Sequence, residues 1–150
     1  MTIYTLQREL WVPRPLTEVF DFFAKAENLE RITPPWMQFR IVTPPPIEMK
    51  QGTMIFYALR VRGIPLKWIS KIDKWDPPHE FVDVQVKGPY RFWHHTHRFS
   101  ERAGGTSIED SVRYALPFGL LGRLVNWLQV AGDLAKIFDY RAQQVQELFR

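Results

Sequence analysis

LLGRLVNWLQVAGDLAKIFDYRAQQVQELF, residues 120–149, carries apolar side chains at steps of three and four residues. This spacing places Leu124, Leu134, Phe138 and Val145 on one face of a helix. The stretch therefore predicts one amphipathic helix of roughly 28–30 residues, about 45 Å long at 1.5 Å per residue. Its first part, residues 120–130, is apolar on nearly every side, so a core contact, a portal, a membrane-touching patch and a dimer contact are all open.

The sequence before this helix shows the alternation of polar and apolar residues that is typical of β-strands. Turn residues at 63, 87–89 and 101–105 separate consecutive segments as in hairpins, which indicates an antiparallel sheet. A helix over residues 16–25 and a short helical turn over 28–31 follow the first strand. The predicted strands cover residues 3–11, 37–42, 53–62, 64–75, 80–86, 90–100 and 106–116.

The order of these elements predicts an α+β fold. A sheet with one apolar face needs a cover, and the long C-terminal helix is the only large element available. We therefore expect a curved antiparallel sheet of about seven strands wrapped around that helix, as one domain over residues 1–150. A cavity remains between sheet and helix wherever side chains do not fill the space.

Composition narrows the function classes. The net charge is +4, but Lys and Arg are scattered, whereas a nucleic-acid-binding protein concentrates them in a stripe, so no nucleic-acid partner is expected. The sequence has no cysteine, which excludes disulfides and thiolate metal sites. Neither a signal-peptide profile at the N-terminus nor a membrane-spanning run is recognisable, and a cytoplasmic location is expected. No phosphate-binding loop or nucleophile motif is present.

Several short motifs resemble one known family. They occur in the same order along nearly the whole chain: Pro15 with Val19-Phe20-Asp21-Phe22-Phe23, Asn28-Leu29, Gly63-Ile64-Pro65, Gly88-Pro89-Tyr90, Trp93-x-His95-x-His97-x-Phe99, and Tyr114-x-Leu116-Pro117-Phe118-Gly119. With this element order, the chain resembles the START-like, Bet v 1-like superfamily (SRPBCC proteins), in its bacterial polyketide cyclase/dehydrase branch. The resemblance implies the helix-grip fold. It leaves the function open among ligand carriers, receptors and enzymes.

The stretch RFWHHTHRFS, residues 91–100, contains three of the four histidines. Strand alternation places His95 and His97 on the inner face with Trp93 and Phe99, and His94 on the outer face. The resemblance favours Phe81, Asp83 and Gln85 as the inner set of the preceding strand. Hairpin register then sets Asp83 near His95, Phe81 near His97, and Asp110 near either histidine.

Four interpretations of this His/Asp group stay open. The carboxylates can satisfy the imidazoles in a buried polar network. The group can orient the oxygen atoms of a ligand. A histidine held by a carboxylate can also move protons, as a cyclisation or dehydration requires, with His95, His97, Asp83 and Asp110 as candidate catalytic residues. The His-x-His spacing suits a divalent ion, but it is a weak motif, and no metal or cofactor is expected.

The sequence thus favours binding of a small hydrophobic molecule, such as a lipid, a polyketide-like ring compound or an isoprenoid. A cyclase or dehydratase and a membrane-surface lipid carrier are the alternatives, and the chain is expected to be a monomer or a homodimer. Inward-facing residues of the strands, together with one residue of the long helix, are the predicted ligand-binding set: Tyr57, Trp68, Ser70, Phe81, Asp83, Gln85, Trp93, His95, His97, Phe99, Asp110, Tyr114 and Trp127.

Overall fold

A computed structural model describes residues 1–150. Its strands are β1 (Tyr4–Val12), β2 (Arg40–Ile41), β3 (Met54–Val61), β4 (Ile64–Asp76), β5 (Glu80–Lys87), β6 (Phe92–Arg102) and β7 (Gly105–Ala115). Helix α1 (Leu16–Phe23) and the 3-10 helices η1 (Ala26–Ile32) and η2 (Pro35–Met37) follow β1. The C-terminal helix consists of α2 (Gly119–Val125), a π-helical segment η3 (Asn126–Val130) and α3 (Ala131–Leu148).

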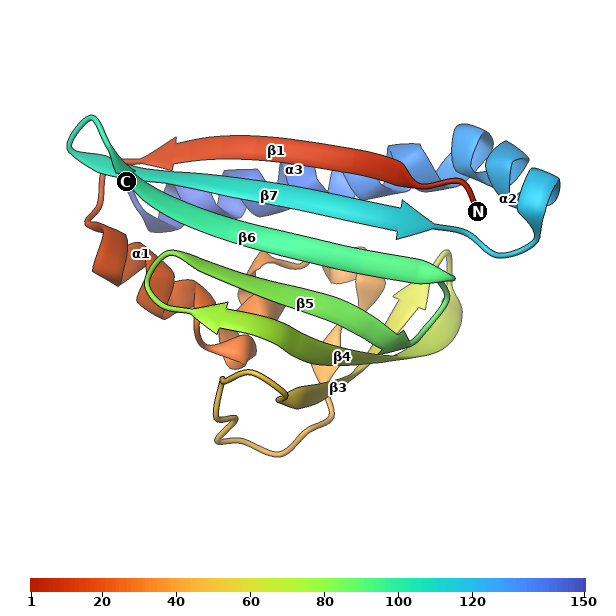
Figure 1. Cartoon of the computed structure of the whole chain (residues 1–150), viewed down its shortest axis with the longest axis horizontal. Coiled ribbons are helices and arrows are strands. Elements are labelled where there is room, and N and C mark those ends of the chain that lie inside the picture. The colour runs from red at the N-terminus through yellow and green to blue at the C-terminus, as the bar shows by residue number, and fades with distance from the viewer.

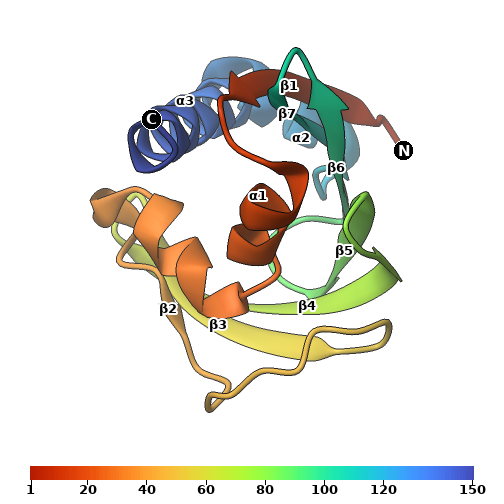
Figure 2. The same cartoon turned by 90° about the vertical axis from the view of Figure 1, so that its left-hand side faces the viewer.

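The seven strands form one antiparallel sheet in the order β1-β7-β6-β5-β4-β3-β2. Seen from the side, the sheet curves strongly, and α3 lies across its open side (Figure 2). Helix α1 lies at one end of the curve and α2 extends beyond the other end (Figure 1). This is the predicted helix-grip α+β fold.

The main core lies under α1, where four aromatic rings meet. Phe20 is 2% exposed and packs its ring against Trp75, Phe81 and Phe99, with centroids 5.2–6.1 Å apart. The C-terminal residues of α3 join this cluster through Val145. The packing holds α1, the sheet and the end of α3 together.

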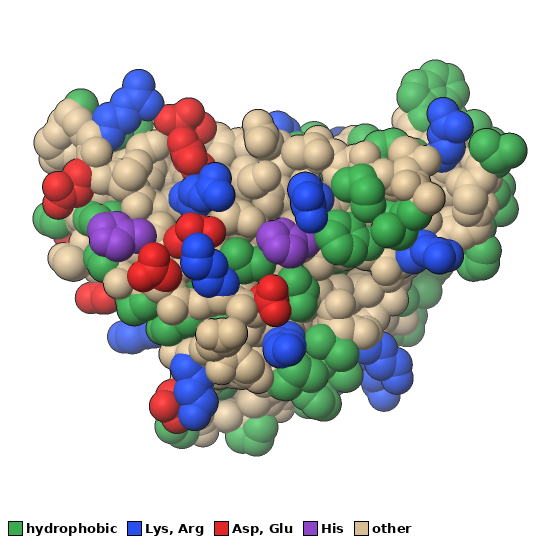
Figure 3. All heavy atoms as spheres, in the orientation of Figure 1, with side chains coloured by type: hydrophobic (Ala, Val, Ile, Leu, Met, Phe, Trp, Pro, Cys, Tyr) green, Lys and Arg blue, Asp and Glu red, His purple; other side chains and the backbone are tan.

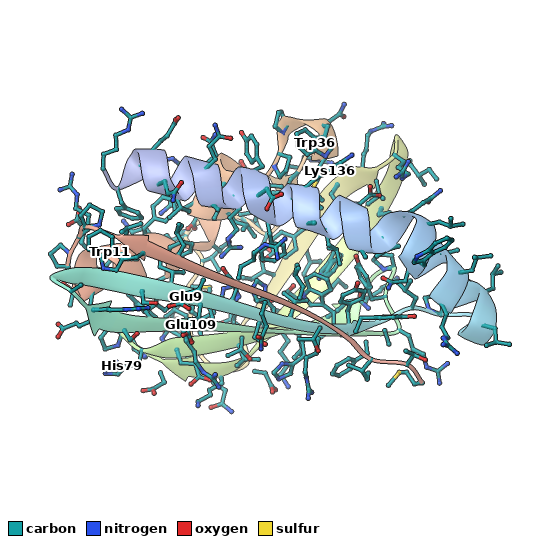
Figure 4. All side chains as sticks on the ribbon, turned by 90° about the horizontal axis from the view of Figure 1, so that it is seen from above. Glu9, Trp11, Trp36, His79, Glu109 and Lys136 are labelled. Atoms are coloured by element: carbon teal, nitrogen blue, oxygen red, sulfur yellow. The ribbon has the colours of Figure 1, made fainter.

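The predicted strand over residues 37–42 is largely wrong. Only Arg40 and Ile41 pair with β3, while residues 35–37 form η2 instead. A proline at the first position suits a helical turn, because its fixed φ matches the turn and it has no N–H to leave unpaired. Trp36 of η2 then lies beside α3 (Figure 4), where its ring packs against the ring of Tyr140 with centroids 5.8 Å apart.

The C-terminal helix is continuous as predicted, but its first part is not in the core. Leu120 and Trp127 are 79% and 78% exposed, because α2 and η3 extend past the end of the sheet. Hydrophobic side chains gather at this end of the molecule (Figure 3). Within η3 the wider π turn brings Asn126 inward, where it accepts a hydrogen bond from the Tyr114 hydroxyl at 2.7 Å.

None of the helices is long and apolar enough to cross a membrane.

Candidate functional site

A cavity of about 630 Å³ lies between the concave face of the sheet and α3. Most of its wall is hydrophobic, including Leu59 and Leu66 of the β3–β4 hairpin, Leu134 of α3, and Phe118 and Leu121 at its α2 end. Its size lies within the range of small-molecule sites, roughly 300–1,000 Å³.

A polar cluster interrupts this apolar wall. His95 and His97 stack their rings with centroids 3.6 Å apart, and Phe81 stacks on the other face of His97 at 4.1 Å. The His95 Nε2 lies 2.8 Å from Asp110 Oδ1, and the His97 Nε2 lies 2.6 Å from Asp83 Oδ2. Two stacked imidazoles are thus held between two carboxylates.

Strand register produces this arrangement. Asp83 pairs with His95 and Phe81 with His97 across β5 and β6, as predicted, and Asp110 pairs with His97 across β6 and β7. Each carboxylate reaches diagonally to the histidine next to its own partner, since side chains two residues apart share a face of the sheet. The predicted carboxylate on each side of two inward histidines is therefore present in the structure.

Arg141 of α3 completes the cluster. Its guanidinium Nη2 lies 3.5 Å from Asp110 Oδ1, and the group sits over the rings of Phe23 and Phe138. Burial raises the pKa of the Asp110 carboxyl, but Arg141 and the hydrogen bond from His95 outweigh burial, so the pKa lies well below its usual value. Asp110 is therefore ionised at neutral pH.

The pKa of Asp83 is lowered for a similar reason. Burial raises it, but the hydrogen bond from His97 and the charges of both imidazoles and Arg141 outweigh that effect. For His97, desolvation by burial and the neighbouring His95 lower the pKa from 6.5 to about 4, despite the opposing carboxylates. His97 is therefore neutral at pH 7 although it contacts a carboxylate.

The cluster has the parts that proton transfer needs. A carboxylate that accepts a hydrogen bond from one imidazole nitrogen fixes the tautomer and leaves the other nitrogen free to take up a proton. Such a pair can act as a general base on a group placed within hydrogen-bond reach.

The same residues offer donor atoms for a metal ion. One atom each from Asp83, His95 and His97 lies within 4.8 Å of the others. The His97 Nε2 and Asp83 Oδ2 are already joined by a hydrogen bond of 2.6 Å, so a cation that used this pair of atoms would have to displace the shared proton.

Eight of the thirteen predicted ligand-binding residues line the cavity: Tyr57, Trp68, Ser70, Phe81, Asp83, Trp93, His95 and His97. The other five lie outside its wall. Asp110 sits behind the histidines, and Phe99 packs against Phe20 and Phe23 in the core. The side chain of Tyr114 is turned to Asn126.

Gln85 and Trp127 leave the wall for different reasons. The Gln85 amide donates to the Tyr90 carbonyl at 2.7 Å and accepts from the Tyr90 N–H at 3.0 Å, so it closes the β5–β6 turn instead of facing the cavity. Trp127 points into solvent, because the π turn replaces it by Asn126 on the inner side. His94, placed on the outer face by alternation, is only half-buried and lies near Phe92.

Arg141 is the main residue that sequence reasoning missed. It continues the apolar stripe of α3, three residues after Phe138 and four before Val145. A charged residue in the middle of a buried stripe is itself a signal, because an arginine there needs a partner. Asp133 was missed as well. It lines the cavity, and its carboxylate accepts hydrogen bonds from the Arg62 guanidinium at 2.9 and 3.0 Å.

Comparison with known proteins agrees with this geometry. The family described as polyketide cyclase/dehydrase and lipid transport matches residues 12–135. The chain belongs to this family. No curated protein matches the sequence. The description of this family names polyketide cyclases, dehydrases and lipid transport, which indicates binding of hydrophobic ligands at the level of the family.

Solved structures share the same fold. Ara h 8.0201 aligns at a TM-score of 0.64 and 18% identity over 96% of this chain and 98% of that one. The major latex-like protein 151 from Panax ginseng aligns at a TM-score of 0.71 and 10% identity, over 98% of this chain and 97% of that one. Membership in the Bet v 1-like superfamily, predicted from the sequence motifs, is thereby confirmed.

One similar structure is a much longer protein. A nucleoside-diphosphate sugar epimerase from Corynebacterium glutamicum aligns at a TM-score of 0.71 and 26% identity, over 95% of this chain but only 28% of that one. The present chain is therefore similar to one part of that epimerase.

Proposed function

We propose that this protein binds a small, predominantly apolar molecule between the sheet and α3. The observation that carries the proposal is the cavity of about 630 Å³, whose wall is mostly hydrophobic and has one buried His/Asp/Arg cluster. Apolar walls supply affinity through the removal of ligand surface from water, and a few fixed polar groups set the orientation. A lipid, a polyketide-like ring compound and an isoprenoid all fit this description.

Native mass spectrometry of freshly purified protein tests the proposal. We expect a co-purified small molecule that is released when the protein unfolds. Leu66→Asp should remove the added mass, because it places a carboxylate on the cavity wall. Ile64→Asp is the matched control and should retain it, since Ile64 lies on the same strand but is 63% exposed.

A protein with no added mass that also binds no apolar fluorescent probe would contradict the proposal. A probe that binds Leu66→Asp as tightly as the unmodified protein would place the ligand outside the cavity.

A carrier that loads at a membrane surface is a second candidate. The apolar side chains of α2 and η3 are exposed, as is Phe118 just before α2. Phe118, Leu121 and Val125 also line the cavity. An exposed apolar patch of this kind typically marks an interaction surface. Because the patch adjoins the cavity, contact with lipid would bring the cavity mouth to the bilayer.

The one-domain organisation over residues 1–150, the choice between monomer and homodimer, and a cytoplasmic location remain predictions. Chemistry on the bound molecule, as in a cyclase or dehydratase, also remains a prediction. It would use His95 or His97 as acid or base and Asp83 or Asp110 to orient it.

A further inference from the structure

The polar cluster presents hydrogen-bond acceptors to the cavity. Ionised carboxylates cannot donate, so the 2.8 and 2.6 Å contacts require the proton of each imidazole to lie on Nε2. In the neutral ring, each Nδ1 then carries a lone pair. Both Nδ1 atoms lack a hydrogen-bond donor in the structure.

The distances agree with this assignment. The His95 Nδ1 faces Asp83 Oδ2 at 3.8 Å, and the His97 Nδ1 faces Asp110 Oδ1 at 3.5 Å, without a hydrogen bond. A protonated Nδ1 facing a carboxylate would close to about 2.8 Å, whereas two acceptors stay apart. Each gap is therefore a pair of acceptors with no proton between them.

Only one of the two gaps opens to the cavity. The His97 Nδ1 is the one buried side-chain nitrogen or oxygen without a partner, so it is fully enclosed. The His95 Nδ1 also has no partner but is not enclosed, and the Asp83 side chain beside it keeps 20% exposure. Both residues line the cavity. The His95 Nδ1–Asp83 Oδ2 gap is thus the open acceptor pair.

We propose that the bound molecule carries a hydroxyl group that donates a hydrogen bond into the gap between His95 Nδ1 and Asp83 Oδ2. This inference rests on the proposed ligand-binding function and specifies the class of ligand: an apolar molecule with an alcohol or phenol group. The hydroxyl supplies a donor to the His95 Nδ1, which has no hydrogen-bond partner in the structure and faces a mostly apolar cavity.

Charge disfavours a carboxylate in the same place. Asp83 and Asp110 bring two negative charges to the cluster, and Arg141 brings one positive charge that lies beside Asp110. An anionic ligand would add a further negative charge in a site that is shielded from water, where like charges repel strongly. An ether would fit sterically but would bring only another acceptor.

Three probes with one aromatic body test the inference: 1-hydroxypyrene, 1-methoxypyrene and pyrene-1-carboxylate. Binding is measured by fluorescence titration at pH 7 in the presence of EDTA, so that no metal contributes. A hydrogen bond to a charged acceptor predicts that 1-hydroxypyrene binds about tenfold or more tightly than 1-methoxypyrene. The carboxylate should bind most weakly.

The outcomes separate the two proposals. Equal affinity for the hydroxyl and methoxy probes, or preference for the carboxylate, would overturn the hydroxyl assignment while ligand binding stands. Failure of all three probes to bind would contradict the ligand-binding function itself, and the hydroxyl assignment with it.

The variant Asp83→Asn tests whether the hydroxyl group binds beside Asp83. Its side-chain amide can donate as well as accept, so the preference for 1-hydroxypyrene should fall to within about twofold. Asp139→Asn makes the same change on the outer side of α3, where Asp139 contacts Arg8 at 3.7 Å, and should keep the preference. A preference that persists in Asp83→Asn would overturn the placement.

Proton–nitrogen NMR of the imidazole rings gives a readout that needs no variant. In the free protein, the His95 Nδ1 should be unprotonated, and 1-hydroxypyrene should shift its signal while leaving that of His94 on the outer face unchanged. A protonated His95 Nδ1 in the free protein would overturn the inference.

Discussion

At the scale of single residues, the stacked histidines show how position along a strand determines which side chains form the polar cluster. His95 and His97 alternate with outward-facing neighbours, so both reach the concave side of the sheet, and the carboxylates of two adjoining strands meet them there. Both histidines and Asp110 were predicted from spacing and register, and Asp83 was predicted from the family resemblance together with register. Arg141 was not predicted, because it comes from a helix whose rotation relative to the sheet depends on packing.

The lowered pKa of His97 predicts loss of stability in mild acid. The unfolded chain takes up a proton near pH 6.5, whereas folded His97 does so only near pH 4. Between these values the unfolded state binds more protons, so the free energy of unfolding falls as the pH falls, by up to about 3 kcal/mol. The lowered pKa values of Asp83 and Asp110 extend the loss below about pH 3.8.

Urea denaturation at pH 7 and pH 4.5 measures this dependence. His97→Gln should flatten it between these two pH values, because glutamine does not titrate. His94→Gln, which makes the same change on the outer face, should leave the slope unchanged. A wild-type protein equally stable at both pH values would show that burial does not keep His97 neutral.

At the scale of elements, the C-terminal helix contains two different environments. From Leu134 onward its apolar stripe packs on the sheet and the α1 core, whereas α2 and η3 have little to pack against. In the sequence, residues 120–130 are apolar on nearly every side, and this pattern does not show that they lie outside the core. Only the end of the sheet decides where burial stops.

The two glycines of this helix should respond in opposite ways to alanine. A Cβ at Gly122 would collide with the Pro117 carbonyl oxygen, whereas a Cβ at Gly132 has no neighbour within 4 Å. We expect Gly132→Ala to raise the free energy of unfolding by about 0.5–1 kcal/mol, since alanine is the better helix former. Gly122→Ala should lower it by about 1 kcal/mol or more, because the start of α2 must shift.

Urea denaturation of the two variants measures both effects. Destabilisation by Gly132→Ala would show that this glycine allows a contact absent from the structure. Unchanged or increased stability in Gly122→Ala would show that α2 does not pack against Pro117 as described.

At the scale of the whole molecule, the curved sheet and the C-terminal helix enclose the cavity, and the residues at the α1 end differ from those at the α2 end. Under α1, aromatic packing forms the main core. Near the other end, Arg62 of the β3–β4 turn binds Asp133 of α3, which connects the two sides of the cavity across the surface. The exposed apolar residues of α2 and η3 belong to this end of the molecule, where hydrophobic side chains gather (Figure 3).

Contact of this end with lipid predicts binding to vesicles. Arg123 is the only charged residue between Leu116 and Gly132, so a bilayer with anionic lipid should be preferred. In flotation with phosphatidylcholine/phosphatidylserine vesicles, Leu120→Glu combined with Trp127→Glu should reduce the bound fraction at least about fivefold, since a buried charge is costly in the bilayer.

A matched double variant at two exposed apolar positions near the other end of β3, Val42→Glu with Met54→Glu, should bind vesicles as the unmodified protein does. If the unmodified protein stays entirely in solution, the membrane-carrier candidate is wrong, while binding in the cavity is unaffected.

The sequence by itself determined the local features of this protein. Period-two and period-3.6 patterns set nearly all strands and the long helix, and hairpin register placed Asp83 and Phe81 opposite His95 and His97. These features depend on neighbours close in the chain or on adjoining strands, where alternation and turn position fix which side chains meet.

Tertiary structure decided what depends on curvature and on helix placement. Examples are the short β2, the exposure of Trp127, the hydrogen bonds of the Gln85 side chain to Tyr90, and the position of Arg141 beside Asp110. The apolar periodicity of a sequence shows which face of a helix is buried. It does not show where the sheet under the helix ends, and it does not show how far the helix lies from the sheet. The volume of the cavity is set by those two quantities, so it follows only from the packed molecule.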